Sequence, residues 1–553
     1  MAYTITDACK GCTLCAKNCP VGAITGNLKE QHVIDPKVCI SCGLCSKLCA
    51  VGAILDDAGN PTSKVKKEDW MHPEFNNGVC AGCSVCIRNC PKNCLELTKP
   101  KNHGDIRTFA YLANAEECIG CGLCEKACPV DAIKLVKQGE KPYFVSNNFG
   151  GVKEMISKIY CKIFQAVMKL ANYFLGYRMP EYISGPGSIE KLPGLMKAKG
   201  ANNALVVTDS NLVKLGIMDP MLKALEEAGL NYVVFSDLAV NPTTKNVEEG
   251  YKVYVENKCE CLVAFGGGAP MDCAKGIGAK TCHPNKTATQ MQGLLKVGKK
   301  LPLFFAVPTT SGTGSETTLA AVITDDETHH KASINDPHII PHYAILDPTL
   351  TKGLPPKVTS TTGMDALCHA VEAYTNKTYN TPLEDHLAKD AVRLIHNSLL
   401  KAYQDGSDLK AREDMQLAAF YAGRAFTRGC VGYVHACGHT LGGLYGVPHG
   451  LAMSVILPHV MRQFGPAVYS RLADLADVCC MDGNDDKEKA LNFIAWMEDL
   501  NKQMDIPTGF DCIKEEDIPQ IIKWANAESN PLYPTPVKWA KKDFEQLIAS
   551  IRL

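Results

Sequence analysis

The sequence predicts two small cysteine-rich α+β modules, then an α/β domain with a parallel sheet and an all-α domain. Seventeen of the 28 cysteines lie before residue 130. From about residue 178 to 352, short apolar strands alternate with amphipathic helices, as in a parallel sheet covered by helices. From residue 353 to 553 the periodicity is helical, and this part carries a group of histidines.

Length and composition limit the class of protein. A chain of 553 residues is too long for one core, and 46% hydrophobic with 21% charged residues is typical of globular proteins. The net charge of −1 gives no reason to expect a nucleic-acid partner. The N-terminus lacks the apolar core of a signal peptide, and no run of about 18 apolar residues predicts a membrane span. We therefore expect a cytoplasmic protein whose cysteines bind metal and do not form disulfides.

Four cysteine runs share the spacing C-x2-C-x2-C-x3-C, beginning at Cys9, Cys39, Cys80 and Cys118, and three are followed by proline. With two-residue gaps, three thiolates of a run can bind one cubane cluster while the fourth cysteine binds the neighbouring cluster. Zinc ribbons also use C-x2-C pairs, but four triplet runs favour iron–sulfur clusters. Cys94 lies outside the pattern and is expected to be a packing residue.

These runs resemble two clostridial-type two-cluster ferredoxins in tandem, at residues 1–57 and 79–135, with the polar stretch 56–78 as the connector. The resemblance implies four [4Fe-4S] clusters with crossed ligation. The first cluster would be held by Cys9, Cys12, Cys15 and Cys49, and the second by Cys39, Cys42, Cys45 and Cys19. The third would be held by Cys80, Cys83, Cys86 and Cys128, and the fourth by Cys118, Cys121, Cys124 and Cys90.

Residues 151–177 are predicted to form an amphipathic linker helix. Its apolar stripe consists of Ile156, Ile159, Ile163, Val167, Leu170 and Phe174. Three roles fit this stripe: packing one domain on another, contacting another chain, or lying on a membrane surface. The first role is the favoured interpretation.

Two loops predict a nucleotide site in residues 178–352. The glycines at 266–268 follow an apolar strand and precede a helix, so a pyrophosphate could approach the backbone and the helix N-terminus. The stretch PTTSGTGSE at 308–316 adds a loop of small hydroxyl residues after the strand LFFAV. Neither loop has the G-x-G-x-x-G pattern, and the alternative is a pair of ordinary tight turns. Together they favour a dinucleotide site.

A metal site is predicted in residues 353–553. Asp365 and His369 stand four residues apart in a helical stretch, and His435 and His439 repeat that spacing ahead of His449. A single helical histidine is more often a core or surface residue. One carboxylate with several imidazoles, carried by two helices and a following loop, is nevertheless the donor set of a first-row transition metal.

Four motifs in this order resemble those of the iron-containing (group III) alcohol dehydrogenases: GGGAPMDCAK, PTTSGTGSE, GMDALCHAVEAYTN and HACGHTLGGLYGVPHG. The resemblance runs from about Met179 to the C-terminus. It implies Fe2+ held by Asp365, His369, His435 and His449, with His439 lining the pocket near the nicotinamide. It also implies dinucleotide contacts at Gly267, Gly268, Thr309, Thr310, Thr313, Thr318, Asn241 and Lys331.

Three details qualify this resemblance. Ala269 replaces the serine that the family more often has, so weaker pyrophosphate binding is expected. Asp209 ends the strand ALVVTD, where a carboxylate accepts from ribose hydroxyls and repels a 2′-phosphate, which favours NAD over NADP. The same ligands would hold Zn2+ at least as tightly as Fe2+.

The expected activity is hydride transfer between a small primary alcohol or aldehyde and NAD(H). A divalent metal lowers the pKa of a bound oxygen and polarises a carbonyl, which favours this transfer. His439 could relay the proton or only position the substrate. We also expect a homo-oligomer.

Iron–sulfur clusters carry single electrons, whereas nicotinamide takes a hydride, and no flavin motif is evident. Three hypotheses follow. The clusters exchange electrons with a separate redox partner protein; they are structural or sense oxygen; or the chain is chiefly an electron carrier. The complete metal quartet argues against the third hypothesis.

Overall fold

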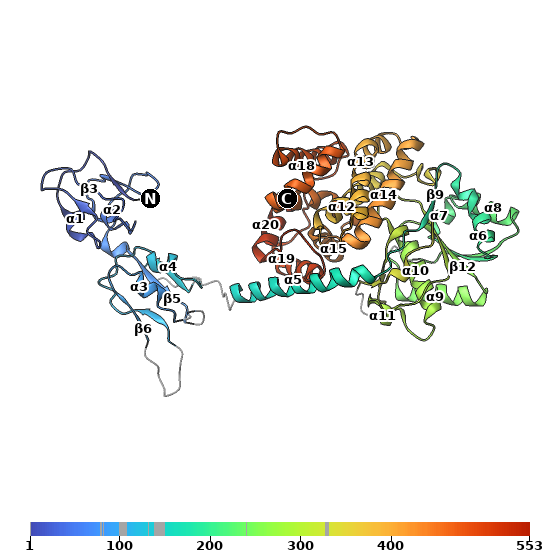
Figure 1. The fold of residues 1–553 in the computed structure, drawn as a ribbon, viewed down its shortest axis with the longest axis horizontal. Coiled ribbons are helices and arrows are strands. Elements are labelled where there is room, and N and C mark those ends of the chain that lie inside the picture. The colour runs from blue at the N-terminus through green and yellow to red at the C-terminus, as the bar shows by residue number, and fades with distance from the viewer. Residues whose placement is uncertain are drawn as a thin grey trace, which may run out of the picture. The chain divides into compact units, whose positions relative to one another are not determined.

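The computed structural model describes residues 2–77, 80, 82–98, 108–130, 132–137, 150–238, 241–326 and 331–553, without the side chains of 150–158. The chain divides into an N-terminal unit, Met1–Ser157, and a C-terminal unit, Lys158–Leu553 (Figure 1). In the described part of the chain, no helix is long and apolar enough to cross a membrane.

Each cysteine-rich module contains two short antiparallel strand pairs and two short helices that follow its cysteine loops. In the first module, the pairs are β1 (Thr4–Ile5) with β4 (Ile54–Leu55) and β2 (Ile24–Thr25) with β3 (Val33–Ile34), and the helices are α1 (Leu14–Asn18) and α2 (Leu44–Leu48). In the second, they are β5 (Met71–Phe75) with β8 (Ile133–Lys137), β6 (Leu95–Leu97) with β7 (Ala110–Leu112), and helices α3 (Val85–Arg88) and α4 (Leu123–Lys126). The predicted duplication is therefore present.

The stretch predicted as a connector, 56–78, differs from that expectation. Strand β5 lies within it and pairs with β8, so that Phe75 lies opposite Ile133. The side chain of Trp70, just before β5, is buried. The second module therefore begins earlier than residue 79, because one strand of its longer pair comes from this polar stretch.

Helix α5 (Gly150–Phe174) forms where the linker helix is predicted. Its stripe, however, faces solvent: Ile163, Val167 and Leu170 are 60%, 61% and 65% exposed. The opposite face contacts the C-terminal unit, where Gln165 donates from Nε2 to the carbonyl oxygens of Pro531 and Tyr533 at 3.1 and 3.0 Å. The stripe therefore has no partner within the described residues of the C-terminal unit, and its packing of one domain on the other stays a prediction. Ile156 lies outside the described side chains.

The C-terminal unit begins with a six-stranded parallel sheet in the order β11-β10-β12-β14-β17-β9. Its strands are β9 (Glu181–Ser184), β10 (Asn203–Val207), β11 (Asn231–Phe235), β12 (Cys261–Gly266), β14 (Leu303–Pro308) and β17 (Tyr343–Leu346). Alternate residues of β10 pack into two cores on opposite faces, Leu205 and Val207 into one and Ala204 and Val206 into the other. Both faces are covered, which explains why these strands are apolar throughout.

Helices α9 (Thr244–Glu256) and α10 (Gly268–Cys282) pack in one core, and α6 (Leu192–Ala198) and α8 (Asp219–Glu227) pack in the other. The remaining helices here are α7 (Ser210–Lys214) and α11 (Ala288–Met291). A second sheet has the order β13-β16-β15, formed by β13 (Gly293–Leu294), β15 (Ala320–Thr324) and β16 (Lys331–Asn335). The order of the large sheet reverses between β10 and β12, and ligands of such sheets bind at this switch point.

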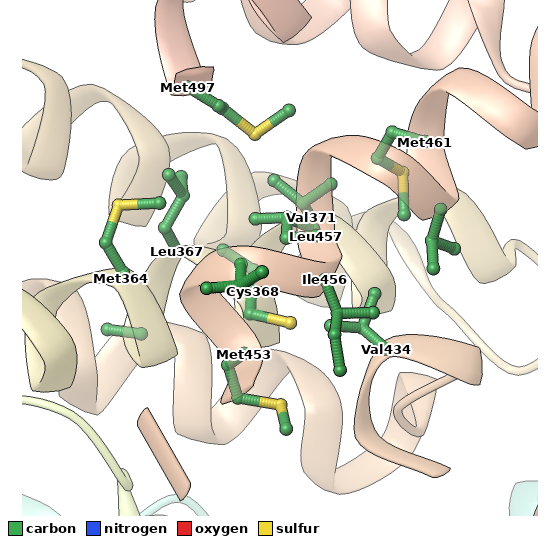
Figure 2. Close-up of a cluster of buried hydrophobic side chains, with 14 of the residues drawn as sticks. Met364, Leu367, Cys368, Val371, Val434, Met453, Ile456, Leu457, Met461 and Met497 are labelled. Carbon is green, nitrogen blue, oxygen red and sulfur yellow. The ribbon is translucent and has the colours of Figure 1, made fainter. Parts of the chain in front are cut away.

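From residue 353 the C-terminal unit is helical, as predicted. Its helices are α12 (Pro356–Asn376), α13 (Pro382–Gln404), α14 (Leu409–Gly429), α15 (Tyr433–Tyr445), α16 (His449–Phe464), α17 (Tyr469–Val478), α18 (Asp486–Gln503), α19 (Ile518–Ser529) and α20 (Lys541–Ile551). A large apolar core joins them. Figure 2 shows part of it, where Val371 of α12 lies beside Leu457 of α16. This packing fixes the backbones that carry the predicted metal ligands.

Candidate functional sites

The four predicted metal ligands converge in the helical part. Ligand atoms of Asp365, His369, His435 and His449 all lie within 4.8 Å of one another. Asp365 Oδ1 is 3.9 Å from Nε2 of His369 and of His435, and 3.3 Å from Nε2 of His449. His449 is the first residue of α16, and not part of a loop as expected. The site thus draws on three helices.

The protonation states of the quartet suit a cation. Burial opposes ionisation of Asp365, but the adjacent histidines, His369 foremost, hold its pKa far below the usual range. Burial lowers the pKa of His369 to about 3 and that of His435 well below its ordinary value, so both rings are neutral near pH 7. Among the described residues, Asp365 Oδ1 and His435 Nε2 are buried without a hydrogen-bond partner. Unpartnered buried polar atoms are costly unless a ligand satisfies them, and a divalent metal fits this donor set.

Glu372 supports the quartet, although the sequence reasoning did not select it. Its Oε2 lies 2.5 Å from His435 Nδ1, and its Oε1 accepts from the backbone N–H of Val434 at 2.9 Å. A carboxylate on Nδ1 leaves Nε2 of His435 free to bind the metal and fixes the ring. A signal was present in the sequence, because positions 365, 369 and 372 share one face of a helix.

A hydrogen-bonded chain leads away from His439, which is next to the quartet. The rings of His439 and His449 stack with centroids 5.2 Å apart. His439 Nδ1 lies 2.7 Å from Glu528 Oε1, and that oxygen also accepts from Tyr533 O–H at 3.0 Å. Burial disfavours a charge on His439, but Glu528 raises its pKa above the ordinary value. Glu528 and Tyr533 lie about 90 residues further along the chain, and no motif marks them.

The predicted nucleotide loops meet at the switch point of the sheet. Thr309 N donates to the carbonyl oxygen of Gly266 at 3.1 Å, so the loop after β14 runs beside the glycine turn after β12. A Cβ on Gly267 would lie 3.4 Å from Thr310 Oγ1, and one on Gly268 would lie 3.2 Å from Thr313 Cγ2. Because glycine has no Cβ, these two positions allow the loops to lie close together and leave the N-terminus of α10 accessible.

A buried lysine holds the second loop in place, and it too was missed. Lys275 of α10 donates from Nζ to Ser315 Oγ, Thr318 Oγ1 and the carbonyl oxygen of Ala320 at 2.8–2.9 Å. Ser315 in turn donates to Asp272 Oδ1 at 2.8 Å. Burial lowers the pKa of Lys275 to about 8, against the opposing charges of Asp272 and Glu316. The predicted contact Thr318 is thus engaged in this network.

The remaining predicted dinucleotide contacts have other partners in the structure. Lys331 Nζ donates to Asn241 Oδ1 at 3.0 Å, so these two residues lie together at the exposed side of the domain. Asp209 Oδ1 accepts from the backbone N–H groups of Asn211 and Leu212 at 2.9 and 3.1 Å, which caps α7. Asp209 follows β10 at the switch point, and its second carboxylate oxygen is not part of the cap.

Two pockets in the second cysteine-rich module gather the predicted crossed cysteine sets. Cys90 lines one pocket together with Cys118, Cys121 and Cys124. The other pocket is lined by Cys80, Cys83, Cys86 and Cys128. In each case the fourth cysteine of one run joins the first three of the other run, as crossed ligation requires.

In the first module, cysteines of both runs pack around one core. The core consists of isoleucines and the buried Cys45. The cysteines packed against it are Cys9, Cys15, Cys19, Cys39 and Cys49. Backbone N–H groups of Ala23 and Ala53 donate to Sγ of Cys19 and Cys49 at 3.2 and 3.3 Å. Such hydrogen bonds to sulfur stabilise the anionic thiolate that binds iron. These cysteines fit iron–sulfur clusters.

Cys94 is buried, as expected for a packing residue, but it also lines the pocket of the fourth set. Its Sγ lies 3.3 Å from Cys90 Sγ. Burial and the neighbouring thiols raise the pKa of Cys94 above its usual range. A protonated thiol at this position can donate a hydrogen bond to a thiolate ligand without competing for iron.

A parallel nucleotide-type sheet beside a helical metal centre defines a metal-dependent oxidoreductase, here preceded by iron–sulfur modules. Family models described as "Iron-containing alcohol dehydrogenase" and "Fe-containing alcohol dehydrogenase family, C-terminal" match residues 180–348 and 359–552. A model described as "4Fe-4S dicluster domain" matches 8–53 and 79–132. The chain belongs to the iron-containing alcohol dehydrogenase family and carries two 4Fe-4S dicluster domains.

The relatives agree with this assignment. The 1,3-propanediol dehydrogenase of Klebsiella pneumoniae is 39% identical over 393 residues, covering 68% of this chain and 99% of the relative. The NAD-dependent methanol dehydrogenase of Bacillus methanolicus is 37% identical, covering 66% of this chain and 97% of the relative.

Solved structures agree as well. The crystal structure of a 1,3-propanediol oxidoreductase is 37% identical with a TM-score of 0.65, covering 68% of this chain and 99% of that one. A sulfoacetaldehyde reductase from Bifidobacterium kashiwanohense in complex with NAD+ is 29% identical with a TM-score of 0.62, covering 68% and 98% of the two chains. The predicted families, fold class and enzyme class are confirmed. The iron and 4Fe-4S cofactors are those that the matched families are named for.

Proposed function

We propose that the C-terminal unit transfers hydride between a small primary alcohol or aldehyde and NAD(H), using Fe2+ held by Asp365, His369, His435 and His449. The convergence of these four side chains, with unpartnered buried atoms facing one another, is the main observation in favour. When bound, the metal supplies Lewis acidity at the substrate oxygen. Zn2+ could occupy the same donors.

We propose that His439 accepts the proton that the alcohol loses on oxidation. His439 lies beside the quartet and is hydrogen-bonded to Glu528, so it can accept a proton at Nε2 and keep the other nitrogen oriented. We expect His439→Asn to lower kcat by about 10²-fold. The pH dependence of kcat should change as well. If kcat keeps the wild-type pH profile in this variant, His439 only positions the substrate.

The dinucleotide is proposed to bind across the loops after β12 and β14, with the pyrophosphate at the N-terminus of α10. Asp209 supports NAD over NADP because its carboxylate would repel a 2′-phosphate. Asp209→Ser retains a helix cap and removes the charge, so it isolates this effect. We expect the NAD preference in kcat/KM to shrink in Asp209→Ser, and an unchanged preference would contradict the assignment.

The substrate class is proposed from the relatives. Their names specify 1,3-propanediol and methanol, which supports small primary alcohols and diols. An anaerobic assay of such alcohols and their aldehydes with NAD(H) tests this class. Activity confined to bulky or secondary alcohols would refute it.

The N-terminal unit is proposed to hold four [4Fe-4S] clusters in the crossed cysteine sets and to exchange electrons with a redox partner protein. A complete set of sixteen cysteines supports four clusters. The one-electron chemistry of the clusters and the two-electron chemistry of nicotinamide argue for a separate partner. Sixteen cysteines that must stay reduced to bind iron suit a reducing compartment, so we propose that the protein is located in the cytoplasm.

Two assays together separate electron exchange with a partner protein from a structural role of the clusters. Rates of NADH-dependent aldehyde reduction are compared with clusters oxidised and with clusters reduced by dithionite. Equal rates would show that the clusters do not feed the nicotinamide, in agreement with the proposal. Electron transfer to an added ferredoxin-type acceptor then tests the partner role, and its absence would favour structural or sensing clusters.

Self-association is proposed to use the exposed face of α5. Tyr160, Ile163, Val167, Leu170 and Phe174 follow steps of three and four, and all are more than half exposed. A repeat of this kind is the pattern of a helix–helix seam between chains. A homo-oligomer would cover this apolar face.

A further inference from the structure

A lysine of the first cysteine-rich module makes hydrogen bonds to the second. Lys47 of α2 donates from Nζ to the carbonyl oxygens of Ile119 and Gly120 at 3.0 and 2.8 Å. Helix α2 begins two residues after Cys42 and contains Cys45 of the second run. Ile119 and Gly120 form the loop between Cys118 and Cys121. The contact therefore connects the ligand loops of the second and fourth predicted clusters.

A small apolar cluster surrounds this contact. Leu44, Trp70 and Ile119 are buried together, with Cys42 and Cys121 packed at the edge of the cluster. Trp70 donates from Nε1 to the carbonyl oxygen of Val65 at 3.3 Å, and Lys47 Nζ lies 5.6 Å from the centre of the indole ring. Each module thus contributes one cysteine and at least one buried apolar side chain to the same contact.

The charge of Lys47 lies close to both sets. Its ammonium group donates to the loop between Cys118 and Cys121, and its backbone lies between Cys45 and Cys49. One ammonium group is therefore close enough to act on clusters bound by both sets.

We propose that the two modules form one electron path in which the clusters follow the order first, second, fourth, third. This inference rests on the proposed function, because it requires that the cysteine sets hold [4Fe-4S] clusters. With clusters bound by the cysteine sets, each step would move one electron, so that one cluster would be oxidised as its neighbour is reduced, and no atom would be transferred. The crossed sets keep the two clusters of each module adjacent, and the Lys47 contact joins the second to the fourth. The first and third clusters are then the ends of the path.

Lys47 has a defined electrostatic role in this arrangement. Reduction adds a negative charge to a cluster, and a nearby partly buried cation stabilises that charge. Loss of the cation should lower the reduction potentials of the second and fourth clusters together. Lys17 occupies the same place in the first cysteine run, between Cys15 and Cys19, but is exposed. It therefore provides a matched control.

The test uses the full-length protein, purified anaerobically, with iron and sulfide measured first. Midpoint potentials are obtained from dithionite titrations followed by EPR in the wild type, Lys47→Gln, Lys47→Arg and Lys17→Gln. Cys42→Ser and Cys121→Ser alter the spectra of single clusters and so identify the second and fourth signals. We expect Lys47→Gln to shift these two potentials negative, Lys47→Arg to restore them, and Lys17→Gln to leave both unchanged.

Three results would overturn the order. These are a shift confined to one cluster, a shift of the first or third cluster, or no shift in Lys47→Gln while all four clusters are retained. A wild-type protein without iron and sulfide in these modules would instead overturn the proposed cluster function, and the order with it. The metal analysis thus distinguishes the two failures.

Discussion

In the N-terminal unit, three of the four cysteines proposed for each cluster come from one seven-residue stretch, whereas the quartet of the C-terminal unit spans residues 365 to 449. The two units also differ in the size of their hydrophobic cores. The first cysteine-rich module buries five apolar side chains as its core, and the helical part buries several dozen. A module with so small a core needs its metal to fold, while the helical part has a core of its own.

Removing the clusters should have the largest effect on stability, and this effect should be confined to the N-terminal unit. Stripping the clusters with an oxidant and chelator is expected to abolish the fold of the N-terminal unit, since structural metals contribute on the order of 10 kcal/mol to small domains. Limited proteolysis then digests the front of the chain, while residues 158–553 persist with an unchanged melting transition. Survival of both units would show that the cysteine-rich modules are stable without metal, against this comparison.

Removing a ligand of the quartet should abolish activity and leave the fold intact. His435→Ala is expected to lower kcat/KM by about 10³-fold, because the Lewis acid contributes several kcal/mol at the substrate oxygen. Iron content should fall by about one ion per chain. The melting transition of the C-terminal unit is the control, and activity close to wild type would contradict the metal assignment.

Removing the carboxylate behind the quartet should have a smaller effect. Glu372→Gln is expected to weaken metal affinity by about 10–100-fold, because His435 loses the partner that orients its ring. Competition with a chelator measures this affinity. Glu316→Gln is the matched control, since Glu316 is a carboxylate as deeply buried as Glu372 but lies outside the quartet. Equal affinities in the two variants would show that Glu372 does not position His435.

The exposed face of α5 should affect assembly only. Ile163→Glu combined with Leu170→Glu is expected to reduce the oligomer to smaller species without changing kcat per chain, because both side chains lie far more than half exposed. Light scattering measures the mass. Lys162→Glu together with Lys169→Glu changes charge off the stripe and serves as the control. An unchanged mass would place the oligomer contact elsewhere.

The sequence was sufficient for much of this account because the ligands follow fixed local spacings. Cysteine runs and pairs four apart on a helix need no knowledge of distant contacts, so Asp365, His369 and the cluster cysteines could be selected directly. Lys275 follows the glycine loop, and Glu372 shares a helix face with His369, so both were within reach. Glu528 and Tyr533 were not, because only tertiary packing brings α19 and the following loop to His439.

Two features of the fold were beyond the sequence for a similar reason. The apolar stripe of α5 is a correct reading of helical periodicity, but periodicity does not say which face finds a partner. On the opposite face Gln165 donates to the carbonyl oxygens of Pro531 and Tyr533, and Cys161 and Asn172 are buried there. Likewise the polar stretch 56–78 lacks the pattern of a strand, and β5 forms there because β8 offers it a partner.

The central claim is that one chain binds iron in two separate ways. The N-terminal unit holds four [4Fe-4S] clusters, and the C-terminal unit holds one mononuclear ion. Iron and acid-labile sulfide analysis of the anaerobically purified wild type and His435→Ala tests it most directly. The account predicts about 17 iron and about 16 sulfide per chain, with about one iron fewer and the same sulfide in the variant. Zinc without sulfide in the N-terminal unit, or equal iron in both proteins, would contradict it.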